Sequence, residues 1–170
     1  FQMLQQVTGR AGRGEALGRG LVQTYQPDHP VIKALISGDF ERFYQEETEQ
    51  RRRAGLPPFG RLAALIISGP DRQSAERHAR QLVRAAHALP PSDRWYLPRP
   101  GEMPGPEDIM LLGPAEAPIA VVRKRHRFRI LVKGPRQADL QGFIRSVLEA
   151  AERPHAGVRV AVDIDPQSFL

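Results

Sequence analysis

The sequence of 170 residues predicts an α+β protein, and three observations indicate this class. Alternation of apolar and polar residues marks strands at 126–133 and 158–165, and a continuous apolar run marks another at 61–68. Apolar residues spaced three and four apart mark helices at 71–89 and 140–151. Because strands and helices interleave along the chain, we expect one layer of helices packed on one sheet.

The chain before residue 30 is predicted to contain the end of a helix, a loop and a short strand. Residues 1–19 have the pattern of a helix end followed by a glycine-rich loop. The stretch that follows alternates over 21–24, which predicts a short strand closed by Pro27 and Pro30.

Two helices are expected between residues 30 and 55. The first contains Val31, Leu35 and Ile36 and stops at Gly38. Asp39 is placed to cap the second, which ends at Gly55 before two prolines. We expect three aromatic residues of the second helix to point inward: Phe40, Phe43 and Tyr44.

The second helix ends in three consecutive arginines, at 51–53. Its acidic residues come early and its basic residues late, which complements the helix dipole. A contact between the arginines and DNA is the alternative interpretation, and the sequence leaves both open.

The segment from residue 58 is predicted to hold six elements. The strand at 61–68 is followed by the helix at 71–89, in which Leu82, Val83, Ala86 and Leu89 point inward. Residues 90–106 contain six prolines and predict a loop, with a short extended piece at 95–97. A further strand is expected at 109–113.

The strand at 126–133 alternates between two faces. One face has His126, Phe128, Ile130 and Val132, and the other has Arg127, Arg129, Leu131 and Lys133. The helix from 140 to 151 then buries Leu140, Phe143, Ile144, Val147, Leu148 and Ala151. The last strand is expected to bury Val158, Val160, Val162 and Ile164.

The resulting order is strand, helix, strand, strand, helix, strand. This βαββαβ order is typical of the ferredoxin-like fold, in which two helices cover one face of a four-stranded antiparallel sheet. We therefore place a domain boundary near residue 58, with a C-terminal domain at 58–170.

Composition favours an anionic partner. The formal net charge is +6 and the sequence pI is about 10.4, values that suit nucleic acid first. The excess of arginine over lysine also fits the codon bias of a GC-rich genome, so the position of the charge carries more information than its sum. Cysteine is absent and the five histidines lack ligand spacing, so no metal site is predicted.

No apolar run approaches the length of a membrane span, so we expect no membrane contact. A cytoplasmic location is a separate expectation. We also expect a monomer. The sequence begins at Phe1 rather than at methionine and is interpreted as cut from a longer protein.

One motif near the N-terminus has the pattern Q-x-x-G-R-x-G-R. Its residues are Gln6, Gly9, Arg10, Gly12 and Arg13. The pattern resembles the final motif of superfamily-two helicases. Forked guanidinium donors match the charge that develops on a transferred phosphoryl group, and glycines let the backbone turn sharply between them.

The resemblance implies that Arg10 and Arg13 reach ATP held by another lobe, with Gln6 near the nucleotide and Gly9 and Gly12 shaping the loop. The sequence contains neither G-x-x-x-x-G-K-[ST] nor D-E-x-H, so it lacks a phosphate cradle and a magnesium-binding acid. We therefore expect no ATP hydrolysis by this chain alone, and ATP and Mg only in the longer protein.

Several stretches occur in an order that resembles one family from end to end. They are LQQVTGRAGRG, GRGLVQTYQPDHPVI, FYQEETEQRRRAGLPPFGRLAALIISG, LLGPAEAPIAVVRKRHRFRILVKGP and VAVDIDP. Together they resemble the C-terminal part of the PriA family, the bacterial primosomal replication-restart helicases (primosomal protein N-prime).

The resemblance implies the end of a RecA-like helicase lobe at 1–28, a helical connector at 29–57, and a domain similar to ribosomal protein S-ten at 58–170. It further implies an ATP-dependent helicase of three-prime-to-five-prime polarity that binds branched DNA. Its implied partners are branched and single-stranded DNA, the single-stranded DNA-binding protein and other primosome proteins. The family's zinc site would lie upstream of this chain. Residues 93–108 depart from the family pattern and are interpreted as an insertion.

A run of basic residues between 123 and 136 is the predicted DNA contact. Its residues are Arg123, Lys124, Arg125, Arg127, Arg129, Lys133 and Arg136. Guanidinium groups on one face of a strand can neutralise phosphates, although an edge strand protected by charge gives the same pattern. Phe128 alternates with Ile130, so we expect it in the core rather than against a base.

Two further expectations concern polar residues near the C-terminus. Gln137 and Gln141, beside Arg136, are candidates for gripping the acidic tail of the single-stranded DNA-binding protein. Asp163 and Asp165 share one face of the last strand, but without a third ligand a strand end before Pro166 is the preferred interpretation.

The alternative function is a free-standing RNA- or protein-binding module with an S-ten-like fold. A nucleotide-contacting motif has no purpose in such a module, which favours the helicase fragment.

Overall fold

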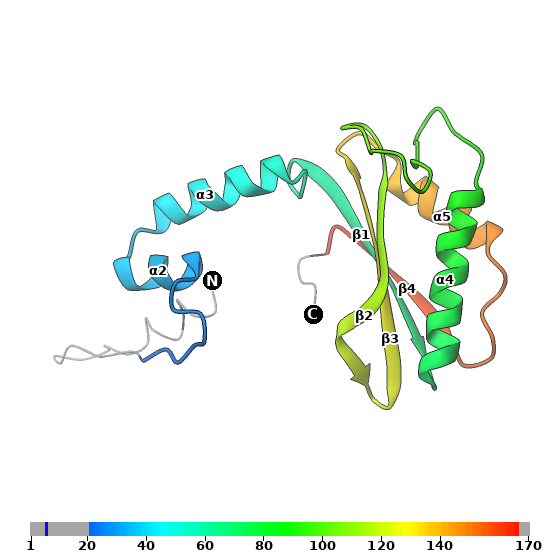
Figure 1. Ribbon diagram of the computed structural model, residues 1–170, viewed down its shortest axis with the longest axis horizontal. Helices are drawn as coiled ribbons and strands as arrows, with labels where there is room; N and C mark the ends of the chain where they lie inside the picture. Colours follow the sequence, from blue (N-terminus) through cyan, green and yellow to red (C-terminus); the bar gives the residue numbers. More distant parts are fainter. Residues whose placement is uncertain (1–5, 7–20, 167–170) are drawn as a thin grey trace. The chain divides into compact units, whose positions relative to one another are not determined.

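The computed structural model describes Gln6 and residues 21–166. The chain divides into two compact units, Phe1–Gln50 and Arg51–Leu170, and the division falls inside a helix. The domain boundary predicted at residue 58 lies a few residues further along the chain. The helices and strands of both units are labelled in Figure 1.

The first unit contains α2, Pro30–Ser37, and most of α3, Phe40–Arg53. Both predicted helix signals are confirmed: Gly38 ends α2 with φ at 72°, and the Asp39 carboxylate accepts a hydrogen bond from the Arg42 N–H at 3.1 Å. His29 caps α2, because its Nδ1 accepts a hydrogen bond from the Val31 N–H at 3.2 Å.

Two predictions for this unit are wrong. Residues 21–24 form no strand, because a strand requires a paired neighbour and this segment has none among the described residues. Tyr44 is exposed, whereas Phe40 and Phe43 are half-buried. Tyr44 directly follows Phe43, so it is turned about 100° away from it around the helix.

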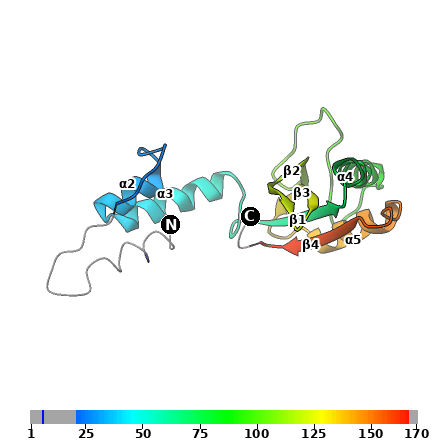
Figure 2. The same cartoon turned by 90° about the horizontal axis from the view of Figure 1, so that it is seen from below.

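The second unit contains one sheet and two helices besides the end of α3. Its elements are β1, Gly60–Gly69; α4, Arg72–Ala88; β2, Met110–Val122; β3, Arg125–Pro135; α5, Leu140–Ala150; and β4, Arg159–Ile164. The strands are all antiparallel in the order β2-β3-β1-β4. Figure 2 shows α4 and α5 on one face of this sheet, which is compatible with the predicted ferredoxin-like arrangement.

The core lies between the sheet and the two helices. Inward residues of β1 and β3 meet the apolar stripes of α4 and α5, as the periodicity predicts. The largest fully buried side chains are Phe143, Leu65, Ile67, Leu82, Ile109, Ile130, Leu140 and Val132. Phe128 is buried, which confirms its predicted place in the core.

Two residues expected in the core are exposed. Leu148 is 37% exposed and Val162 is 41% exposed. Both line an open groove of about 420 Å³ between α5 and β4. The alternation of β4 predicts which side a residue faces, but β4 is an edge strand and the helix layer does not fully cover it.

Strand β2 is longer than the strand predicted at 109–113. It continues to Val122 through Pro114 and Pro118, with irregular pairing to β3 between Leu112 and Ala115 and between Glu116 and Val121. Proline is tolerated here because β2 is an edge strand that pairs only with β3. On the outer side of β2 there is no neighbouring strand whose hydrogen bonds would need the missing N–H.

The long loop between α4 and β2 is attached to the core. Trp95 packs edge-on against Phe143 of α5, with ring centroids 6.0 Å apart, and Leu97 also contacts the core. The Ile109 N–H donates a hydrogen bond to the Tyr96 carbonyl at 2.7 Å, although no strand forms at 95–97. The predicted loop over 90–106 is therefore confirmed, and the extended piece within it is not a strand.

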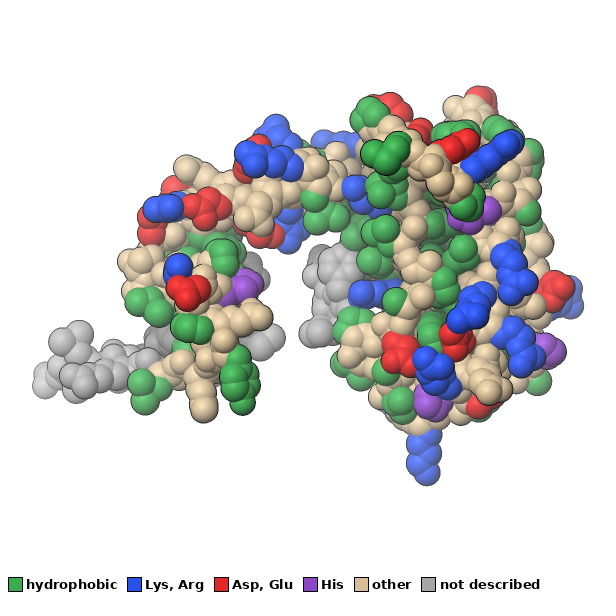
Figure 3. Space-filling view, in the orientation of Figure 1, with side chains coloured by type: hydrophobic (Ala, Val, Ile, Leu, Met, Phe, Trp, Pro, Cys, Tyr) green, Lys and Arg blue, Asp and Glu red, His purple; other side chains and the backbone are tan. Residues whose placement is uncertain are grey.

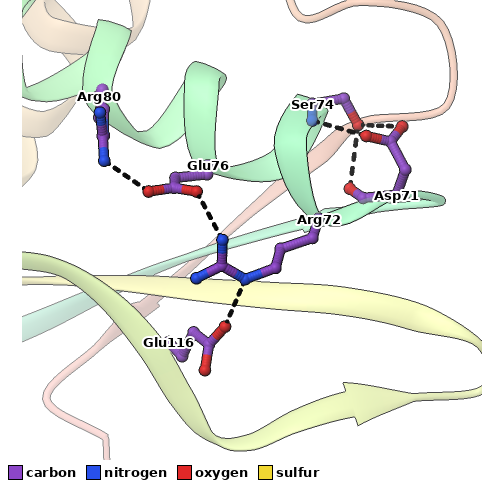
Figure 4. A network of polar contacts seen from close by, with 6 residues as sticks. All are labelled: Asp71, Arg72, Ser74, Glu76, Arg80 and Glu116. Carbon is purple, nitrogen blue, oxygen red and sulfur yellow. Dashed lines mark hydrogen bonds and ion pairs between the residues drawn. The ribbon is translucent and has the colours of Figure 1, made fainter.

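A polar network joins the start of α4 to β2 (Figure 4). Arg72 donates to Glu116 at 2.8 Å and to Glu76 at 3.0 Å, and Arg80 pairs with Glu76 at 2.6 Å. The hydrogen bond and charge of Glu116, followed by the charge of Glu76, raise the pKa of Arg72. Asp71 caps the helix, and hydrogen bonds from Ser74 lower its pKa.

Among the described residues, no helix combines the length and apolar composition that a membrane span requires.

Candidate nucleic-acid interface

Strand β3 separates its apolar and basic residues onto opposite faces of the sheet. Phe128, Ile130 and Val132 are buried under the helices, whereas Arg127 and Arg129 lie on the opposite face and are half-buried. The Arg72 guanidinium lies over the Phe128 ring at 5.6 Å, so this ring packs against α4.

The face opposite the helices carries arginines on two strands, β3 and β4, which lie on either side of β1. Ser68 of β1 pairs with Arg127 of β3 on one side and with Arg159 of β4 on the other. Neighbouring strands lie about 4.8 Å apart, so the two arginine Cα atoms are about 10 Å apart. Arg129 lies one step further along the same face, opposite Ile66. Within the described residues, neither Arg127 nor Arg159 has an ion pair. We call Arg127, Arg129 and Arg159 the sheet arginines.

Sequence reasoning missed Arg159. It alternates with Val158 and Val160, so its face was readable from the pattern. Arg159 comes into line with Arg127 because β4 pairs with β1. The sequence does not predict this pairing, since strand register depends on contacts distant in the sequence.

The tip of the β2–β3 hairpin presents two predicted site residues. Arg123 and Lys124 form the two-residue turn, are exposed, and have φ values of 50° and 61°. These angles place both in the left-handed region that hairpin turns of this length require.

Arg125 has a structural role that the sequence did not reveal. Its Nη2 donates to the Ser68 carbonyl at 2.8 Å and also to the Gly157 carbonyl. It thereby ties the start of β3 to the end of β1 and to the loop before β4.

Lys133 and Arg136 lie at the other end of β3, six or more residues from Arg127 and so about 20 Å away. They line a cleft of about 370 Å³ together with Arg52 and Arg53 at the end of α3. Arg52 also lies over the Phe59 ring at 4.4 Å. The predicted basic run therefore forms two separate groups, one at each end of β3.

The two glutamines proposed for partner binding are not in one site. Gln137 donates to Glu107 and lines the cleft with Arg136, whereas Gln141 lines the groove between α5 and β4.

The N-terminal motif falls largely outside the described residues. Gly9, Arg10, Gly12 and Arg13 are not described, and Gln6 is exposed. The predicted contacts with ATP and Mg therefore remain predictions.

Comparison with known proteins places the greater part of this chain in a family. The model of the primosomal protein N C-terminal domain matches residues 52–167. The chain belongs to this family. The resemblance predicted from the ordered sequence stretches is therefore confirmed for the primosomal protein N C-terminal domain.

Named relatives share the same stretch of sequence. Replication restart protein PriA of Rickettsia conorii is 32% identical over 169 residues, which cover 99% of this chain and 23% of that protein. The proteins of the same name from Bacillus subtilis and Treponema pallidum are 31% and 36% identical, over 100% of this chain. The chain spans 19% to 23% of the length of these three relatives.

Proposed function

We propose that this chain is the C-terminal portion of an ATP-dependent replication-restart helicase and that its own role is to bind branched DNA. The observation that carries the proposal is the set of sheet arginines, which brings three cations from two strands onto the face of the sheet opposite the helices. Membership in the primosomal protein N C-terminal domain family supports the replication context.

The sheet arginines suit a backbone contact rather than sequence reading. Their guanidinium groups can neutralise phosphates, and Phe128, the aromatic residue that alternates with them, is buried and unable to stack on a base. A contact of this kind positions DNA by its shape and charge, which is what recognition of a fork requires. The hairpin tip, with Arg123 and Lys124, extends the basic surface at the same end of β3.

The single-stranded DNA-binding protein and other primosome proteins are the partners we propose for the longer protein. Gln137 and Gln141 lie in different depressions, so a single peptide would contact only one of them closely. The cleft that contains Gln137, Arg136 and Lys133 has the charge to receive an acidic tail.

The proposal is tested by titrating the 170-residue chain with forked DNA, blunt duplex and an RNA hairpin across a range of salt concentrations. We expect the fork to bind most tightly. Changing Arg127 and Arg129 together to glutamine should lower the slope of log K against log salt by about 1–2, because each phosphate contact contributes about 0.9.

The matched control is R145Q/R153Q, which removes the same charge at two exposed positions outside the sheet. It should leave the slope of the unmodified chain unchanged. An equal slope for R127Q/R129Q and the unmodified chain would remove the sheet arginines from the interface. Tighter binding to RNA than to the fork would favour the alternative, a free-standing RNA-binding module.

A further inference from the structure

Helix α4 carries a stripe of arginines on the face that points away from the sheet. Arg77, Arg80 and Arg84 are exposed and spaced three and four apart, so they lie in one line along the helix. At 1.5 Å per residue, the line is about 10 Å long. Figure 3 shows Lys and Arg side chains gathered over α4, and the three arginines line a shallow depression of about 290 Å³. We call these three residues the α4 stripe.

Helix stability does not account for the α4 stripe. Glu76 is the only acidic residue of α4, and it already pairs with both Arg72 and Arg80. Within the described residues, Arg77 and Arg84 have no ion pair. Arg80 and Arg84 are like charges one turn apart, which weakens a helix by a few tenths of a kcal/mol.

The α4 stripe lies on the opposite side of the domain from the sheet arginines. Residues of α4 that face the sheet are buried, namely Ala75, His78, Ala79, Leu82 and Ala86. The stripe therefore points outward from the helix layer, whereas the sheet arginines lie on the side of the sheet opposite the helices. A straight duplex lying against one side cannot reach the other.

We propose that the α4 stripe is a second DNA-binding surface, which contacts the phosphates of a duplex other than the one held at the sheet. The charge is complementary, and over about 10 Å of axis one DNA strand carries about three phosphates. This inference rests on the proposed function and adds to it: one domain holds two arms of a branched DNA on its two faces.

The variant R77Q/R84Q tests the stripe while keeping both ion pairs of Glu76. Glutamine has nearly the helix propensity of arginine, so the helix should remain intact, and a thermal melt by circular dichroism checks this. We expect the salt slope for duplex DNA to fall by about 1–2 relative to the unmodified chain. R77K/R84K, which restores the charge, should recover the slope, and R145Q/R153Q should not change it.

If one chain holds two duplexes at once, it brings them close together, which we call bridging. Bridging is measured by fluorescence energy transfer between donor-labelled and acceptor-labelled duplexes, with duplexes in twofold excess over the 170-residue chain. We expect transfer with the unmodified chain and its loss in R77Q/R84Q and in R127Q/R129Q, each of which should still bind one duplex.

The inference is overturned if R77Q/R84Q matches R145Q/R153Q in slope and bridging while R127Q/R129Q is impaired. It is also overturned if R77Q/R84Q loses binding to a labelled polyglutamate peptide but bridges duplexes normally, since the partner would then be an acidic protein. Failure of the proposed function would give a result different from these two outcomes. In that case R127Q/R129Q would also bind DNA with the same affinity and salt slope as the unmodified chain.

Discussion

Asp165 joins the end of β4 to the start of β1. Its N–H donates to the Leu62 carbonyl at 2.7 Å, and its carboxylate accepts from the Leu62 N–H at 3.1 Å and from Arg61 at 2.9 Å. Its φ of 49° is in the left-handed region, which aspartate and asparagine tolerate better than most residues. Asp165 thereby fixes the end of β4 against the start of β1, and these hydrogen bonds account for its position.

Replacing Asp165 by asparagine should destabilise the second unit by about 0.5–1 kcal/mol at neutral pH. Asparagine keeps the backbone conformation and one acceptor but loses the charge, and the side chain is 40% exposed, so solvent screens the pair with Arg61. Urea denaturation measures the difference.

The difference should depend on pH in a defined direction. Partial burial raises the pKa of Asp165, but hydrogen bonds from Leu62 and Arg61 and the charge of Arg61 outweigh it, so the pKa lies below 3.8. Because the pKa of Asp165 is lower in the folded state than in the unfolded state, the ionised carboxylate stabilises the fold at pH values above the unfolded-state pKa. This stabilisation is lost as the pH falls through the folded-state pKa. The gap between the two proteins should be full above about pH 5 and shrink below 3.8. A gap that does not change with pH would contradict the role of the charge.

Arg125 and Arg127 show what sequence reasoning could resolve in the basic run. Both were predicted as DNA contacts on the same grounds. Arg125 donates to two backbone carbonyls, whereas Arg127 has no ion pair in the described part of the chain and lies on the face opposite the helices. The charge pattern located the region, but only the acceptors of each guanidinium separate a structural arginine from a candidate for binding.

At the scale of elements, the hairpin tip combines strain with charge. Arg123 and Lys124 occupy left-handed positions that asparagine and glycine fill at lower energy. Backbone strain at an exposed basic tip is an observation from which a binding role can be inferred.

The variant R123N/K124G should therefore be more stable than the unmodified chain, by about 1 kcal/mol in urea denaturation. It should also bind forked DNA with a salt slope lower by about 1–2, because two cations are removed. R145Q/R153Q again controls for net charge. Unchanged stability would refute the strain, and an unchanged slope would place the tip outside the interface.

Elements with strong periodicity were predictable and weakly marked ones were not. A long apolar pattern marks each of the four elements that supply most of the core, which are β1, α4, β3 and α5. The second half of β2 contains two prolines and irregular pairing, so its sequence lacks the marks of a strand. The segment 21–24 has those marks but no paired neighbour among the described residues.

For the molecule as a whole, the proposed division of labour separates ATP hydrolysis from DNA binding. The Q-x-x-G-R-x-G-R motif precedes α2 in the sequence, and the basic surfaces belong to the unit that begins at Arg51. Substitutions in the motif should therefore leave DNA binding largely intact, and substitutions in the basic surfaces should leave ATP hydrolysis largely intact.

Arg13→Ala in the longer protein should lower ATPase activity by about a thousandfold, because the guanidinium would no longer stabilise charge on the transferred phosphoryl group. Fork binding should remain near that of the unmodified protein. Lysine at this position should rescue little, since it lacks the planar fork. A steady-state phosphate-release assay makes the measurement, and near-normal hydrolysis would refute the role of Arg13.

The prolines and irregular pairing of β2 bear on how this sheet behaves in concentrated solution. An edge strand with a regular row of free N–H and C=O groups is a template on which a second molecule can add a strand. Pro114 and Pro118 lack that N–H, and the shifts in register break the row. The opposite edge, β4, has six residues and carries Arg159 and Asp163. Edge-to-edge aggregation is thus opposed at both sides of the sheet, by backbone chemistry at β2 and by shortness and charge at β4.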